Sequence, residues 1–355
     1  MEPPVLTGIS GSVFLVGDAG ILSPGRDSVL AHLARELRRH EADTPDASRT
    51  VLFLGDNIYE VGAREEFRTE DQQKLMPQLE AARGAADARA YFLPGNHDWA
   101  MGADHPEAVE SIRRQQAWLH ELAPDSSARL VPADGCPGPE LIPVSPGVSL
   151  ILIDTEWLLR GPEGTCGGEE RFYEKLTDLL RAHSKERVVL AAHHPMATGG
   201  AHAGNVSGLD GGPFIRYLAI KAGLSIQDLA SPRYSAMLTR LREAISASGV
   251  QPLGFAAGHD HSLQVIGMTG EGQPAWQFVS GSASKSSKAR RIEGTRYASD
   301  QHGYMRLDFT PMASRVTVFA QTAADTPLRA VFTCELAEEP ESITTCAEAP
   351  LLGSR

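Results

Sequence analysis

The sequence has no excess of basic residues and no long apolar run. Its 355 residues include 33 Lys and Arg against 45 Asp and Glu, which gives a formal net charge of −12 at pH 7. Proteins that hold a nucleic-acid backbone without sequence preference replace its counterions with Lys and Arg side chains, and this chain has no surplus of them. No stretch approaches the roughly 20 apolar residues that cross a bilayer. We therefore expect neither a nucleic-acid scaffold role nor a membrane span.

Cysteine is also scarce, with four residues in the chain. They fall into two pairs that are close in sequence, Cys136 with Cys166 and Cys334 with Cys346. Two disulfides would fit this spacing and would imply an oxidising compartment, whereas four reduced thiols would fit the cytoplasm. The first residues, MEPPVLTGISGS, show no charged start followed by an apolar segment, so the sequence as given predicts no signal peptide.

What the chain does have is five short polar motifs, each placed after an apolar run. The motifs are GDAG (17–20), GDNIY (55–59), GNHDW (95–99), AAHHP (191–195) and GHDH (258–261). Apolar runs such as VFLV and VLFL are typical of buried strands, and ligands gather beyond the carboxyl ends of strands in open α/β sheets. The motifs carry carboxylate, amide and imidazole groups, which are metal ligands. We therefore expect five strand ends to converge on one metal site.

The order of these motifs resembles the calcineurin-like metallophosphoesterases, and in particular their purple acid phosphatase branch. Most of that superfamily has a metal-binding His two residues after the first Asp, but here the residue two after Asp18 is Gly20. Tyr59, three residues after Asp56, can supply the missing donor as a phenolate, as in purple acid phosphatases. The loss of one ligand together with the gain of another favours this branch.

The resemblance implies two metal ions, Fe(III) at the tyrosine site and a divalent Fe, Zn or Mn ion beside it. The ligands implied for metal 1 are Asp18, Asp56, Tyr59 and His261. The ligands implied for metal 2 are Asp56, Asn96, His193 and His259. Asp56 would bridge the two ions through its two oxygens. His193 is preferred to His194 because it occupies the family's position directly after the strand.

Two further histidines match residues that family members point at the phosphate. His97 follows Asn96 directly, and His202 lies in GGAHAG, on the long segment after His193. Animal members have an acidic residue before the second of these histidines, where this chain has Ala201. The resemblance therefore implies catalytic roles for His97 and His202 and leaves the acid that protonates the leaving group open. Taken singly, each could instead be a hydrogen-bonded loop histidine.

The expected activity is hydrolysis of phosphate monoesters by direct attack of a metal-bound hydroxide. The substrate would be a phosphorylated small molecule or a phosphoprotein. Phosphodiester hydrolysis at the same site is one alternative, and a non-catalytic scaffold that binds a phosphorylated ligand is another. Bacterial relatives that share the stretch DGCPGPE (134–140) look like exported proteins, which favours the periplasm or cell surface over the cytoplasm.

Helical and strand patterns alternate along the first 250 residues, and strands dominate the C-terminal part of the chain. The expected helices are 26–40, 71–83, 106–122, 169–183 and 232–246, and the expected C-terminal strands are 263–266, 275–279, 304–309, 316–321 and 328–333. With the resemblance, this pattern predicts an α/β fold, a four-layer α/β/β/α sandwich. We expect a single catalytic domain over 1–334, a long loop over 196–231 and an acidic coil tail over 335–355.

One basic cluster stands out, in GSASKSSKARR (281–291). Its members are Lys285, Lys288, Arg290 and Arg291. It could be a solvated, mobile loop, or a patch that steers an anionic substrate toward the metals.

Overall fold

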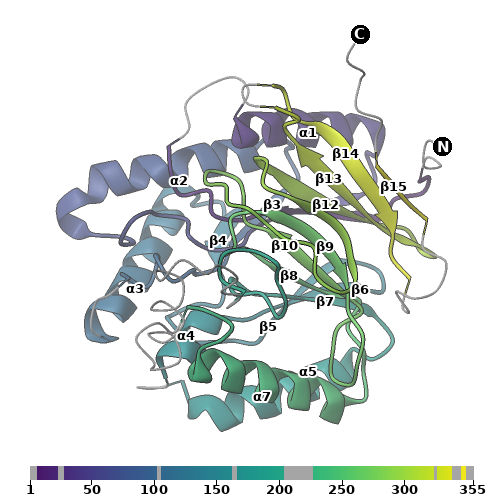
Figure 1. Ribbon diagram of the computed structural model, residues 1–355. Coiled ribbons are helices and arrows are strands. Elements are labelled where there is room, and N and C mark those ends of the chain that lie inside the picture. Colours follow the sequence, from purple (N-terminus) through teal and green to yellow (C-terminus); the bar gives the residue numbers. More distant parts are fainter. Residues whose placement is uncertain are drawn as a thin grey trace, which may run out of the picture.

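A computed structural model describes residues 6–22, 28–101, 105–161, 166–203, 227–323, 326–337 and 345–348. Two β-sheets pack together, and helices cover their outer faces (Figure 1). Within the described residues, one sheet has eight strands in the order β15-β14-β13-β12-β1-β2-β3-β4, and the other has seven in the order β11-β9-β10-β8-β7-β6-β5. The predicted four-layer α/β/β/α sandwich is confirmed.

The first sheet joins a parallel half to an antiparallel half. Its strands are β1 (Gly11–Val16), β2 (Ser48–Phe53), β3 (Arg89–Phe92), β4 (Ala128–Leu130), β12 (Gly303–Phe309), β13 (Ser314–Ala320), β14 (Arg329–Glu335) and β15 (Cys346–Glu348). Strands β1 to β4 are parallel, whereas β12 to β15 form an antiparallel run that joins the sheet beside β1. The parallel strands consequently end at one edge of the sheet.

The second sheet has a parallel centre with antiparallel strands around it. Its strands are β5 (Glu140–Ser145), β6 (Val148–Leu152), β7 (Arg187–Ala191), β8 (Gly254–Ala257), β9 (Leu263–Gly267), β10 (Trp276–Ser280) and β11 (Thr295–Ser299). Strands β6, β7, β8 and β10 are parallel. The predicted strands before the AAHHP and GHDH motifs are thus neighbours in one sheet, and those before the first three motifs are neighbours in the other.

Helices connect the parallel strands. They are α1 (Val29–Asp43), the 3-10 helix η1 (Glu65–Phe67), α2 (Arg68–Ala82), α3 (His105–Leu122), α4 (Thr155–Arg160), α5 (Gly168–Ala182) and α7 (Pro232–Ser248). In Figure 1, α1, α2 and α3 lie beside the first sheet, and α5 and α7 lie beyond the second. The predicted helices are all present, although residues 26 and 27 of the first lie outside the described residues. Among the described helices, none is long and apolar enough to cross a bilayer.

Alternation along the strands builds the two kinds of core. In β1, Phe14 and Val16 belong to the cluster that includes the helices, whereas Val13 and Leu15 belong to the cluster between the sheets. All four side chains are fully buried. A strand that is buried on both faces needs apolar residues at every position, which explains the unbroken run VFLV.

Strand β5 was missed by the sequence analysis because it contains Pro143. Proline has no N–H to donate, so it is confined to positions such as the edge of a sheet. The structure places β5 at the end of the strand order, where that missing donor costs no ladder bond on the outer side. The short helix α4 and the strands β4, β6 and β11 were not predicted either.

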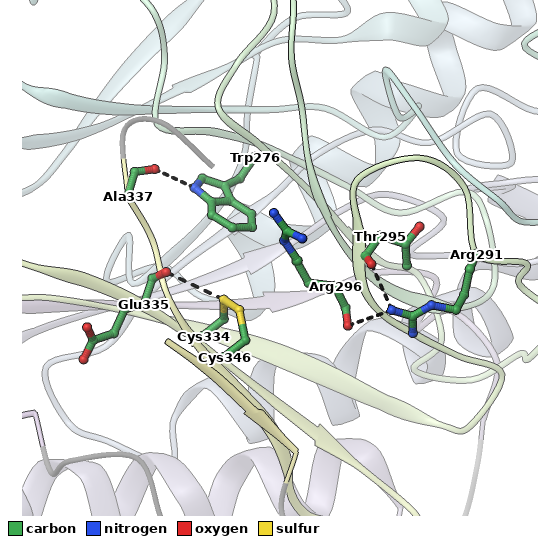
Figure 2. The surroundings of a disulfide bond; sticks show 8 residues. All are labelled: Trp276, Arg291, Thr295, Arg296, Cys334, Glu335, Ala337 and Cys346. Carbon is green, nitrogen blue, oxygen red and sulfur yellow. Dashed lines mark hydrogen bonds between the residues drawn. A yellow bond between two sulfur atoms is a disulfide. The ribbon is translucent and has the colours of Figure 1, made fainter. Parts of the chain in front are cut away.

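The predicted coil tail over 335–355 is wrong at both ends of its described part. Glu335 is the last residue of β14, and Cys346–Glu348 forms β15, which pairs with β14 in antiparallel register. Cys334 and Cys346 face each other in that register and form a disulfide (Figure 2). The disulfide links β15 to β14 at the edge of the sheet. Most of the predicted loop 196–231 lies outside the described residues.

Candidate metal centre

The five motif turns leave the carboxyl ends of β1, β2, β3, β7 and β8, where the two sheets approach each other. Three of their polar residues, Asp18, Asp56 and His259, have positive φ angles of 59°, 54° and 66°. Side chains other than glycine rarely adopt this conformation, and such strain concentrates at functional sites. A Cβ on Gly95 would lie 2.2 Å from Asp56 Oδ1, so glycine is required there for the carboxylate to sit between the turns.

Tyr59 joins Asp18 and His261 in the first group of site residues. The Tyr59 hydroxyl donates to Asp18 Oδ1 at 3.0 Å and lies 3.1 Å from His261 Nε2. His261 Nε2 is itself 3.4 Å from Asp18 Oδ1. The carboxylate, phenol and imidazole predicted for metal 1 therefore point their donor atoms at one another.

Gly20 explains why Tyr59 reaches this position. A Cβ at Gly20 would lie 2.6 Å from the carbonyl oxygen of Asp56 and 2.6 Å from the carbonyl carbon of Asn57, so no side chain fits there. The backbone N–H of Gly20 donates to Asp56 O at 3.0 Å, and the N–H of Tyr59 donates to Gly20 O at 3.3 Å. The missing side chain at position 20 therefore lets the second motif close onto the first.

Asn96 joins His193 and His259 in the second group. Its Oδ1 lies 3.0 Å from His193 Nε2 and 3.2 Å from His259 Nδ1. Asp56 Oδ1 lies 3.4 Å from His193 Nε2, and the Asp56 carboxylate also acts on Tyr59 of the first group, whose pKa it helps to raise. Asp56 thus stands between the two groups, as a bridging carboxylate would. All seven predicted ligand residues converge.

In the second group, the ring nitrogens of His193 and His259 that face Asn96 are free of protons when the rings are neutral, so a cation can bind between them. The carbonyl oxygen of Leu54 can only accept, so His193 carries its proton on Nδ1, 2.7 Å away. By the same reasoning His259 carries its proton on Nε2 and donates to Gln227 O at 2.8 Å. When both rings are neutral, their remaining nitrogens turn lone pairs toward the oxygen of Asn96. Three lone pairs facing one another fit a metal ion, and an imidazole held from behind by a carbonyl is typical of metal-binding histidines.

Burial and the neighbouring charges shift the pKa values of the site residues, often in opposite directions. Burial by itself would raise the pKa of the Asp56 carboxyl, but the rings of His193 and His97 lower it. Burial would lower the pKa of His193, and the carboxylates of Asp56 and Asp18 raise it instead. Burial, together with the nearby His202 and His194, holds the pKa of His259 well below its usual value, which keeps that ring neutral. Asp18, Asp56 and His193 place ligand atoms within 4.8 Å of one another.

The geometry separates His193 from His194. His194 Nε2 lies 2.7 Å from Gln227 Oε1, and because an amide oxygen accepts, the nitrogen must donate. Its Nδ1, 2.8 Å from Thr155 Oγ1, then accepts the hydroxyl hydrogen. Both ring nitrogens are therefore used inside the protein, although His193, His194 and His259 also place nitrogens within 4.8 Å of one another. His193, which turns Nε2 toward Asn96 and Asp56, is better placed to bind a metal ion.

His97 lies at the edge of the site, where the sequence analysis expected it. Its backbone N–H donates to Asp56 Oδ1 at 3.0 Å, and its Nε2 is 3.8 Å from Asp56 Oδ2. Its Nδ1 donates to the carbonyl oxygen of Glu60, and its ring centroid is 4.4 Å from that of Tyr59. With its Nδ1 fixed by a carbonyl, His97 can turn Nε2 toward a bound substrate.

His202 is also brought to the site, with its ring centroid 4.2 Å from that of His259. Its backbone N–H donates to Asp260 Oδ1 at 3.0 Å. The position of Ala201, exposed to solvent, holds no acidic side chain. The structure consequently brings together both histidines that the resemblance singled out.

Several residues that support the site were missed by the sequence analysis. Asp98 accepts from the backbone N–H groups of Gly95, Asn57 and Ile58, and so ties the second motif to the third. The position of Asp98 in the GNHDW motif could have identified it from the sequence. No sequence motif identifies Gln227, because only folding brings it into contact with His194. Lys285 was noticed only as part of a basic cluster.

Comparison with known proteins adds support for the fold. No protein-family model matches the sequence, and no curated protein does. Among solved structures, PhoD has a TM-score of 0.63 at 14% identity, over 99% of this chain and 74% of that chain. The purple acid phosphatase PPD1 from yellow lupin (Lupinus luteus) seeds has a TM-score of 0.56 at 12% identity, over 97% of this chain and 57% of that one.

A third structure with the same fold is GAP50, described as the anchor in the inner membrane complex of Plasmodium. Its TM-score is 0.53 at 12% identity, over 91% of this chain and 89% of that chain. These likenesses show that the chain has a metallophosphoesterase-like fold. Identities this low do not distinguish the branches of that fold, and function has to be argued from the site itself.

Proposed function

We propose that this protein is a binuclear metal-dependent phosphatase that hydrolyses phosphate monoesters. The observation that carries the proposal is the convergence of seven donor side chains in two groups that share Asp56. Burying so many carboxylates and imidazoles is unfavourable unless cations neutralise and coordinate them. Two metal ions held there would polarise the phosphoryl oxygens and acidify a water molecule for attack.

The protein's own residues would divide the remaining work. The hydrogen bonds that His193 and His259 make to backbone carbonyls fix the direction in which their other ring nitrogens point. His97, held by the Glu60 carbonyl, would donate a hydrogen bond to the phosphate or protonate the leaving oxygen. His202, which lies beside His259 of the second group, would assist His97 in these roles. No covalent phospho-enzyme is required.

We further propose the purple acid phosphatase arrangement, with Fe(III) at the tyrosine site and divalent Fe, Zn or Mn at the other. Support comes from the coupling of Gly20 with Tyr59: the position that could carry a histidine ligand has no room for a side chain, and the phenol occupies the place. Phenolate oxygen is a hard donor that suits Fe(III).

The disulfides support an exported protein, in the periplasm or at the cell surface. Cys136 pairs with Cys166, and Cys334 pairs with Cys346. Disulfides persist in oxidising compartments and are rare in the cytosol. Alkylating the protein at the moment of cell lysis and counting unreacted cysteines would test this. Four alkylated thiols would contradict export.

The substitution Asp56→Asn tests the proposed function. It removes the charge and one strong donor of the shared carboxylate, so the variant should retain well under two metal ions per chain and lose turnover of phosphate monoesters. Elemental analysis and a monoester assay would measure both. Glu66→Gln, an exposed carboxylate on the same connection, is the matched control and should behave as the wild type.

Assay of the metal-loaded wild type would decide among the alternatives. Faster turnover of a monoester than of a diester supports the proposal, and the reverse order would show a phosphodiesterase. Tight binding of a phosphonate without turnover of either ester would show a binding scaffold. GAP50, which has a similar fold, is described as an anchor. Two tightly held metals and normal rates in Asp56→Asn would overturn the site assignment.

A further inference from the structure

The segment after β10 lies against the turns of the candidate site and is held there by backbone hydrogen bonds. Ala283 N–H donates to Gly17 O at 3.2 Å, and Ser284 N–H donates to Asp18 O at 3.2 Å. The Ser284 hydroxyl also donates to Asp18 O, and Ser287 N–H donates to His261 O at 2.6 Å. The segment is therefore fixed to the first and last motif turns, which argues against a mobile loop.

The four basic side chains of this segment do not form one patch. Figure 2 shows the guanidinium of Arg291 directed at the carbonyl oxygens of Thr295 and Arg296, to which it donates at 2.9 and 3.3 Å. Lys288 is exposed, and Arg290 is exposed on a backbone bonded to Gly199 O at 2.8 Å. Lys285, by contrast, turns toward Tyr59 among the proposed metal ligands.

Lys285 stands on the rim of the site. Its Nζ lies 3.6 Å from the centroid of the Tyr59 ring and 3.5 Å from Glu60 Oε1. Exposure rises from 2% for Tyr59 to 26% for the Lys285 side chain and 65% for that of Glu60. The ammonium group is thus one layer outside the buried donors, between them and solvent.

We propose that Lys285 binds a second anionic group on the substrate, so that the preferred substrates are phosphate monoesters whose leaving group carries a carboxylate or another phosphate. This rests on the proposed phosphatase function. The scissile phosphate would be held deeper, by the buried donors and His97, so a cation on the rim meets the part of the substrate that extends outward. Because the backbone hydrogen bonds fix the segment in advance, little ordering is needed when the anion binds.

Glu60 is the competitor for the same ammonium group. An ion pair this exposed is weak, because water screens it, so a substrate anion can displace the carboxylate. The negative charge of Glu60 also repels an incoming anion. Removing the charge of Lys285 should therefore weaken binding of dianionic ligands, and removing the charge of Glu60 should strengthen it.

Matched phosphonates test this inference without turnover. One set is ω-phosphonocarboxylates with two, three and four methylene groups, and the reference set carries an isopropyl group in place of each carboxylate. Calorimetric titration of the metal-loaded protein gives the affinity ratio within each pair. In the wild type at least one carboxylate should bind about 3-fold more tightly than its partner, as a gain of roughly 0.7 kcal/mol from one partly exposed charge contact would give.

The variants make the test specific to Lys285. Lys285→Met should bring the ratio near one, Lys285→Arg should preserve most of it, and Glu60→Gln should raise it. Lys288→Met, which removes a charge from an exposed position of the same segment, should leave it as in the wild type. A wild-type ratio near one for every chain length, or equal loss in Lys288→Met, would overturn the role of Lys285. If neither phosphonate set binds at all, the proposed phosphatase function itself fails.

Discussion

At the residue scale, Tyr59 is the side chain on which the proposal of Fe(III) rather than a divalent metal ion depends. Burial, and then the carboxylates of Asp18 and Asp56, raise the pKa of its phenol well above the usual value. Without a metal ion the phenol therefore keeps its proton and donates a hydrogen bond to Asp18. Only a strongly charged cation bound at that point would favour the phenolate, which supports our proposal of Fe(III) over a divalent ion at this position.

The colour of the protein tests the role of Tyr59. Charge transfer from phenolate to Fe(III) should make the iron-loaded, aerobically purified protein violet to pink, and Tyr59→Phe should remove the colour without unfolding the chain. Visible absorption and elemental iron would be measured on the same samples. Tyr91→Phe, a partly buried tyrosine outside the site, should keep the colour. Colourless wild-type protein with full iron occupancy would count against a phenolate ligand.

His97 allows a second prediction at this scale. Its Nδ1 is fixed by the Glu60 carbonyl and its Nε2 is near the Asp56 carboxylate, so His97→Ala should lower kcat by about 100-fold for an alkyl phosphate and leave the metal content unchanged. A nitrophenyl phosphate should suffer less, because its leaving oxygen needs little protonation. His183→Ala, a histidine at the C-terminal end of α5 that is bonded to Glu186 at 2.9 Å, is the control. Equal losses for both substrates would show that His97 binds phosphate and is not the acid.

At the scale of the elements, the Cys136–Cys166 disulfide joins the turn before β5 to the start of α5. It closes 30 residues of sequence that include β5, β6 and the short helix α4. Replacing both cysteines with serine should lower the free energy of unfolding by about 3 kcal/mol, because the unfolded chain regains the entropy that the link removed. Denaturant unfolding without reductant would measure the loss. In the presence of a strong reductant the two proteins should become equal, and a persistent difference would show that the serines disturb packing.

Helix α4 places a second buried layer behind the candidate metal centre. Asp154 caps this helix by accepting from Trp157 N–H, and it also accepts from the indole of Trp99 at 2.8 Å. Glu156, fully buried on the same helix, pairs with Arg160 at 2.8 Å and accepts from Gln227 at 3.0 Å. This layer holds Gln227, whose carbonyl orients His259. Through Gln227, the six-residue helix α4 thereby helps to position His259, a proposed metal ligand on the turn after β8.

For the whole molecule, the pH dependence of stability should be set partly by Asp308, far from the metals in sequence. Burial alone would raise the pKa of its carboxyl, but the charge of Arg306, the nearby His40 ring and a hydrogen bond from Ser12 lower it to about 2. A carboxyl with a depressed folded pKa contributes stability above its unfolded pKa of roughly 4 and loses that contribution as the pH falls toward 2. The buried group thus favours folding at neutral pH.

Asp308→Asn should therefore destabilise the protein in a pH-dependent way. The loss should be about 3 kcal/mol near pH 6, because Arg306 is left without one buried partner, and it should shrink as the pH falls from 4 toward 2. Denaturant unfolding of both proteins across that range would measure it. Glu348→Gln, on the exposed end of β15, should show no such trend. A difference that stays constant with pH would show that Asp308 contributes by packing alone.

Much of the fold could be predicted because the apolar pattern of a parallel strand is local. Unbroken runs such as Val13 to Val16 identified the strands before the motifs, and helical periodicity identified α1, α2, α3, α5 and α7. Elements whose surroundings are not local were missed. Strand β5 contains a proline that only an edge position tolerates, and β15 depends on a disulfide partner 12 residues away.

The sequence by itself determined the residue types of the candidate site and their order, because each follows a strand that its own neighbours define. It also linked Gly20 with Tyr59. The sequence preferred His193 to His194 only by the resemblance, and the tertiary structure adds a geometric reason, because Thr155 and Gln227 reach His194 from distant segments and use both of its ring nitrogens. Only the tertiary structure distinguishes Lys285 from the other basic residues of its segment, because the sequence does not show which of them faces Tyr59.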